Sequence, residues 1–113
     1  MKIYHNPRCT KSREALAIIK NKISEFEIIE YLKNPLTVEE IKVLLPQLNI
    51  TAHELVRTQE TIWKENYKRE ILTDNAIINI MAKNPKLIER PIIEHNNKAV
   101  IGRPPENVLS LFT

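Results

Sequence analysis

With 113 residues, 42% of them hydrophobic and 27% charged, the chain has the size and composition of one globular domain, 1–113. Its formal net charge of +3 comes from Lys and Arg residues that form no run, so no nucleic-acid partner is predicted. No apolar run approaches the roughly 20 residues of a membrane span. The sequence becomes polar after its fifth residue, which argues against a signal peptide. We therefore expect a cytoplasmic protein with no membrane partner.

A strand, a helix and a second strand are predicted at the start of the chain. Residues 2–5 form a short strand, which must end at Asn6-Pro7 because proline lacks an amide hydrogen and restrains the residue before it. Apolar residues at helical spacing then predict a helix over 10–22. The β-branched and aromatic residues of 25–32 indicate the second strand.

Several helices are predicted in the middle of the chain. Two capping boxes, each a Thr followed by a Glu three residues later, open helices at Thr37 and Thr51. Weaker periodicity indicates a helix over 59–68, and Thr73 caps a further one. The all-helical segment therefore spans roughly 37–84.

Two strands and a helix complete the chain. Residues 91–94 and 99–101 flank Asn96-Asn97, a hairpin turn, and Pro104-Pro105 opens a final helix. The order resembles the thioredoxin fold, an α/β fold with β-α-β and β-β-α units around one mixed sheet, here with an all-helical insertion between them. A single glycine in the whole chain excludes the Gly-rich phosphate loops of nucleotide enzymes.

Cys9 stands where the first strand passes into the first helix. It is the only cysteine, so it can form no internal disulfide, and with three histidines it shows no metal-ligand spacing; we predict no metal site. Its neighbours are polar, whereas a cysteine packed in a core has apolar ones. The helix N-terminus and nearby cations should lower its pKa and make it a nucleophile, with His5 and Ser12 as candidate hydrogen-bond donors.

Ser12 narrows the reaction that this cysteine can carry out. It occupies the position at which a C-x-x-C redox site has its second cysteine. Once Cys9 is oxidised, the resolving thiol must therefore come from another molecule, such as glutathione or glutaredoxin.

Four segments resemble the glutaredoxin-coupled arsenate reductase family. Residues 5–13 carry the pattern H-N-P-x-C-x-x-S-R. Leu-Val-Arg at 55–57, the L-x-x-R-P-I stretch at 87–92 and Gly-Arg-Pro at 102–104 are similar to the family's other signatures and follow in the same order. The likeness thus extends over nearly the whole chain.

The resemblance implies an arsenate reductase with a covalent thioarsenate on Cys9. It implies that Arg57, Arg90 and Arg103 hold the oxyanion, which suits the bidentate hydrogen bonds of guanidinium groups. It also implies glutathione as co-substrate, glutaredoxin as partner, no bound cofactor, and a cis peptide bond before Pro91. The short segment after Arg103 is similar to the family's shorter chromosomal branch, and a monomer is expected.

Two alternatives remain open. Spx-type transcription regulators share this fold and bind RNA polymerase, but they use a C-x-x-C switch, which Ser12 interrupts here. A glutathione-dependent thiol reductase with another substrate would keep Cys9 without needing all three arginines.

Overall fold

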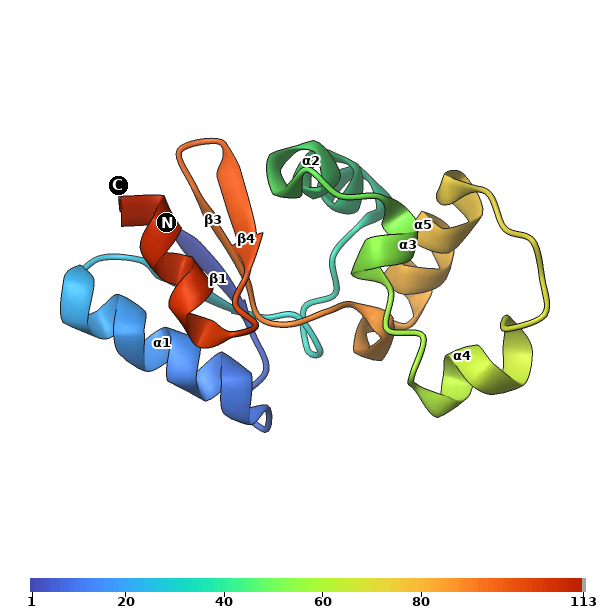
Figure 1. The fold of residues 1–113 in the computed structure, drawn as a ribbon, viewed down its shortest axis with the longest axis horizontal. Coiled ribbons are helices and arrows are strands. Elements are labelled where there is room, and N and C mark those ends of the chain that lie inside the picture. Colours follow the sequence, from blue (N-terminus) through green and yellow to red (C-terminus); the bar gives the residue numbers. More distant parts are fainter. Residues whose placement is uncertain (113) are drawn as a thin grey trace. The chain divides into compact units, whose positions relative to one another are not determined.

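The computed structural model describes residues 1–112, which form two compact units (Figure 1). Unit 1 contains residues 1–34 and the segment from Arg90 onward, and unit 2 contains residues 35–89. The helical segment predicted over 37–84 falls inside unit 2. None of the described helices is long and apolar enough to cross a lipid bilayer.

Unit 1 is a four-stranded mixed sheet with two helices. Its elements are β1 (Lys2–His5), α1 (Thr10–Lys22), β2 (Glu27–Glu30), β3 (Ile92–His95), β4 (Lys98–Ile101) and the 3₁₀ helix η2 (Pro105–Phe112). The strand order is β2-β1-β3-β4, with β1 parallel to β2 and antiparallel to β3, and β4 antiparallel to β3. The predicted thioredoxin-like α/β architecture is thereby confirmed. β2 is shorter than the stretch 25–32 that predicted it.

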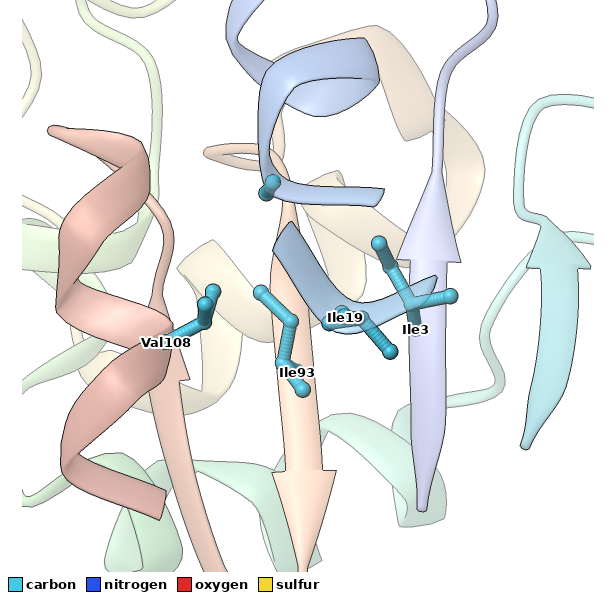
Figure 2. Close-up of a cluster of buried hydrophobic side chains, with 5 residues drawn as sticks. Ile3, Ile19, Ile93 and Val108 are labelled. Carbon is cyan, nitrogen blue, oxygen red and sulfur yellow. The ribbon is translucent and has the colours of Figure 1, made fainter. Parts of the chain in front are cut away.

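Fully buried aliphatic side chains join the sheet of unit 1 to its helices (Figure 2). Ile3 of β1 and Ile93 of β3 are cross-strand partners, and they pack with Ile19 of α1 and Val108 of η2. Full burial of each such side chain contributes about 1.5–3 kcal/mol. This cluster fixes α1, and with it the residue that precedes α1, against the sheet.

Unit 2 is all helical. Its elements are α2 (Val38–Leu48), α3 (Ala52–Leu55), α4 (Thr61–Asn66), α5 (Asp74–Lys83) and the 3₁₀ helix η1 (Pro85–Leu87). Helix α5 packs against α2, α3 and η1. Both predicted capping boxes are present, at Thr37 and at Thr51, whereas the helix predicted over 59–68 is limited to α4.

The β3–β4 hairpin brings three separate parts of the chain to one edge of the sheet. Asn96 and Asn97 both have positive φ (52° and 63°), as a two-residue hairpin turn requires. The register then aligns Tyr4 near the end of β1 with Ile92 at the start of β3 and Ile101 at the end of β4. The residues after β1, before β3 and after β4 therefore meet at this edge.

Candidate active site

Cys9 is the N-cap residue of α1, directly after the loop that follows β1. Its backbone is extended (φ −92°, ψ 122°), and its carbonyl accepts the first helical hydrogen bond, from the N–H of Arg13 at 3.0 Å. Its own N–H donates to the carbonyl of Asn6 at 3.0 Å. No side-chain hydrogen bond caps this helix. The backbone N–H groups of Lys11 and Ser12, in its first turn, donate hydrogen bonds to the sulfur of Cys9 instead.

The surroundings of Cys9 favour its thiolate. Partial burial by itself raises the pKa of the thiol. The backbone N–H of Ser12, the side chain of Arg90, which both hydrogen-bonds to the sulfur and adds its positive charge, and the backbone N–H of Lys11 all lower it. These contributions prevail, so the pKa of Cys9 lies below its ordinary value, as expected for a nucleophile.

Arg90 and Arg103 both reach the sulfur, from either side of the β3–β4 hairpin. Arg90 precedes β3 and Arg103 follows β4, so the sheet register places them beside the residue that follows β1. Nη1 of Arg103 donates to Sγ of Cys9 at 3.8 Å and to the carbonyl oxygen of Arg90 at 3.4 Å. Two guanidinium groups therefore converge on one sulfur. The Arg90–Pro91 peptide bond is cis, as the resemblance implied, and so is Arg103–Pro104.

His5 and Ser12 form a buried pair beneath the loop. Nδ1 of His5 lies 2.7 Å from Oγ of Ser12, and the same oxygen accepts the N–H of Asn6 at 3.0 Å. Burial lowers the pKa of His5 and outweighs the opposing effect of Glu30, and the smaller effects of Lys20 and Arg13 lower it further. His5 is therefore neutral near pH 7. The hydroxyl of Ser12 bonds to His5 and Asn6, while its backbone N–H serves the sulfur.

Two further residues, neither of which a sequence pattern marks for this role, hold the loop in shape. Oδ1 of Asn6 accepts the N–H of Arg8 at 3.0 Å, the local hydrogen bond that an Asn before a turn commonly makes. Arg13 donates from Nη1 to the carbonyl of Pro7 at 2.9 Å and from Nη2 to Oγ1 of Thr10 at 3.3 Å. The guanidinium of Arg13 thus ties the start of α1 to the loop before it.

Gly102, the residue before Arg103, lets the backbone pack closely against Pro91, Ile93 and Ala15. A Cβ atom at this position would lie 2.9 Å from Cγ of Pro91, 3.2 Å from Cδ1 of Ile93 and 3.3 Å from Cβ of Ala15. Its N–H donates to the carbonyl of Pro91 at 2.8 Å. The one glycine of the chain therefore stands where β4 turns toward the cysteine.

Arg57, the third predicted anion ligand, belongs to unit 2. Its Nε lies 3.5 Å from a carboxylate oxygen of Glu60 and 3.5 Å from one of Glu89. Its backbone N–H donates to the carbonyl of Leu87 at 2.6 Å, beside the bridge between Val56 and Ile88. Nη1 is buried and has no hydrogen-bond partner among residues 1–112. Nε of Arg57 is thus paired with two carboxylates, while Nη1 is a donor without a hydrogen-bond partner among the described residues.

The described residues contain no group of three or more His, Cys, Asp or Glu side chains arranged to hold a metal ion. A thiolate at a helix N-terminus beside two guanidinium groups provides a nucleophile and a place for an anion.

The family model, the related sequences and a solved structure all point to the same family. Residues 4–111 match the model of the ArsC family. The chain is 38% identical to arsenate reductase of Haemophilus influenzae, over 97% of both chains. It is 47% identical to the uncharacterized protein YfgD of Escherichia coli, over 98% of this chain and 95% of that protein. The solved structure of an arsenate reductase from Vibrio cholerae is 44% identical and superposes with a TM-score of 0.92, over 98% of each chain.

Proposed function

The chain belongs to the ArsC family, and from this premise we propose that it reduces arsenate to arsenite with glutathione and glutaredoxin. The observation that carries the proposal is the convergence of Arg90 and Arg103 on the sulfur of Cys9. A low-pKa thiol next to two permanent cations suits a reaction between a thiolate and an oxyanion. Without the cations, the two negative reactants would repel each other.

In the proposed complex, the guanidinium groups of Arg90 and Arg103 bind arsenate oxygens through charge-assisted hydrogen bonds. They also withdraw negative charge from arsenic as the thiolate approaches it. Arg57 is the third ligand that the family resemblance implies.

The first chemical step forms a bond between the sulfur of Cys9 and arsenic. One oxygen leaves arsenic as hydroxide and is protonated by solvent to water, giving a thioarsenate in which arsenic is still As(V). Glutathione thiolate then attacks the sulfur of Cys9. The electron pair of the sulfur–arsenic bond passes to arsenic, which leaves as As(III) and is protonated to arsenite. Cys9 remains as a mixed disulfide with glutathione.

The second half of the cycle needs a thiol from outside the chain. Cys9 is the only cysteine, and Ser12 cannot act as a resolving thiol. We therefore assign this step to glutaredoxin, whose thiol attacks the glutathione sulfur and releases the Cys9 thiolate. Arsenate and two thiols thus give arsenite, one disulfide and water, with no bound metal or organic cofactor. The cytoplasm is the compartment that keeps such thiols reduced.

The coupled assay for this activity follows arsenate-dependent NADPH oxidation in the presence of glutathione, glutaredoxin and glutathione reductase. Wild type should turn over and Cys9→Ser should be inactive, while Asn79→Leu, an exposed change in α5, should behave as wild type. If the wild type shows no turnover but Cys9 alkylates rapidly at about pH 6, where an ordinary thiol is protonated, the protein is a reactive-thiol enzyme with another substrate.

A further inference from the structure

The segment that carries Arg103 is held in place by the side chain of Asn107. Nδ2 of Asn107, in the first turn of η2, donates to the carbonyl oxygen of Arg103 at 3.2 Å and to that of Ile101 at 3.2 Å. Both partners are carbonyl oxygens, which only accept hydrogen bonds, so the amide must present its NH₂ group to them. A side-chain NH₂ has two hydrogens, and both are used.

This amide bridges the two residues on either side of Gly102. On the other side of the same segment, the N–H of Gly102 donates to the carbonyl of Pro91 at 2.8 Å. The backbone from Ile101 to Arg103 is therefore fixed from two directions. Beyond it, Nη1 of Arg103 reaches Sγ of Cys9 and the carbonyl of Arg90.

Asn107 is itself anchored and exposed. Its N–H donates to the carbonyl of Pro104 at 3.0 Å, and its carbonyl accepts the hydroxyl of Ser110 at 2.9 Å. The next residue, Val108, is part of the buried cluster of unit 1, which ties η2 to the sheet. The side chain of Asn107 lies at the surface, so its replacement leaves the core intact.

From these contacts we propose that Asn107 is a positioning residue: its amide sets the backbone of Arg103 so that the guanidinium stands at the sulfur of Cys9 and at the oxyanion bound there. The part that concerns the oxyanion rests on the proposed function. The part that concerns the sulfur does not, because the contact between Arg103 and Cys9 is present in the protein alone. Asn107 touches neither reactant and acts only through Arg103.

The test uses Asn107→Leu, which keeps the approximate shape of the side chain and removes both donors. Asn79→Leu is the matched control: Nδ2 of Asn79 also donates to a backbone carbonyl, that of Asn75 at 2.8 Å, on an exposed helix face in unit 2. Asn107→Ala serves as a second variant if the leucine variant unfolds. Thermal unfolding of each protein shows that it is folded at the assay temperature.

Two readouts are measured on each protein. The first is the rate at which iodoacetamide alkylates Cys9 at about pH 6.5, which reports the thiolate fraction. The second is the arsenate concentration that half-protects Cys9 from alkylation. We expect Asn107→Leu to slow alkylation and to raise the half-protecting concentration, each roughly threefold to tenfold. Asn79→Leu should change neither.

A double-mutant cycle with Arg103→Ala decides whether the effect passes through Arg103. In that background, Asn107→Leu should cause no further change in either readout, because the group that it positions is gone. An equal loss in the presence and absence of the Arg103 side chain would overturn the proposal, as would wild-type values for Asn107→Leu alone. If arsenate protects no variant, the wild type included, the proposed function fails, while the alkylation rates still decide the role of Asn107.

Discussion

Arg103 and Cys9 stand 94 positions apart in the chain, and Nη1 of the one lies 3.8 Å from Sγ of the other. Their meeting depends on the antiparallel pairing of β1, β3 and β4, which returns the chain to the edge where β1 ends. The thiol and the cation are thus supplied by the two halves of unit 1. The residues between those halves form unit 2.

The first prediction concerns the pH dependence of Cys9. Because hydrogen bonds and the charge of Arg90 lower the pKa of the thiol, its thiolate persists at a lower pH than that of a free cysteine. Arg90→Ala removes the positive charge and should shift the pH profile of alkylation upward. Alkylation rates with iodoacetamide over a range of pH measure this shift, and an unchanged profile would contradict the assigned role of Arg90.

His5 should make the stability of the protein depend on pH. Its pKa is lowered in the folded state, so the unfolded chain binds more protons than the folded chain does once the pH falls below the ordinary value of 6.5. The free energy of unfolding should therefore be at its full value above this pH and decline below it. Urea unfolding at a series of pH values tests this, with His5→Asn expected to lose that part of the pH dependence. A parallel decline in the variant would refute the assignment.

Ser12→Ala should act on stability more than on thiol reactivity. The hydroxyl is fully buried, accepts the N–H of Asn6 and bonds to His5, so its removal leaves two buried polar groups without a partner. The expected loss is about 1–3 kcal/mol of the free energy of unfolding. The backbone N–H that serves the sulfur remains, so the pH profile of alkylation should stay close to wild type. A large shift of the alkylation profile without any loss in the free energy of unfolding would contradict this prediction.

Gly102→Ala tests the close approach at the end of β4. The added Cβ atom would meet the Pro91 ring at 2.9 Å and Cβ of Ala15 at 3.3 Å, distances that force a local shift. Overpacking of this kind costs about 1–3 kcal/mol, and chemical denaturation measures it. Wild-type stability in this variant would show that the segment is freer to move than the contacts indicate.

Arg57→Ala tests the third proposed anion ligand. Losing charge-assisted hydrogen bonds to the substrate should lower kcat/KM for arsenate by about tenfold to a hundredfold. The coupled NADPH assay measures this, with Lys68→Ala, a change of another cation in unit 2, as the control. Unchanged kinetics would remove Arg57 from the site and favour the thiol reductase alternative.

The fold and the polar setting of Cys9 were predictable because their signals are local. Asn6-Pro7 ends the first strand, and the polar surroundings of Cys9 mark it as something other than a core residue. The bounds of α1 follow the apolar periodicity, and α2 and α3 begin at the predicted capping boxes. Such features need no knowledge of distant contacts.

The rest of the site depends on contacts that sequence patterns do not contain. Nothing near Arg90 or Arg103 signals a cysteine far away in the chain; only the family resemblance pointed to them. Ser12 makes two different interactions: its hydroxyl hydrogen-bonds to His5, and its backbone N–H donates to the sulfur of Cys9. Both follow from the geometry of the first helical turn. Asn107 carries no motif at all, since its role depends on two carbonyl groups that the turn after β4 brings together.

A single turnover without glutaredoxin tests whether Cys9 and glutathione together reduce arsenate. Wild-type protein is mixed with arsenate and glutathione, its intact mass is measured, and released arsenite is quantified, with phosphate in place of arsenate as the control. We expect one arsenite per chain and one glutathione attached at Cys9, neither of which forms with phosphate. Arsenite released over many turnovers without any glutathione on Cys9, or no arsenite at all, would contradict this expectation.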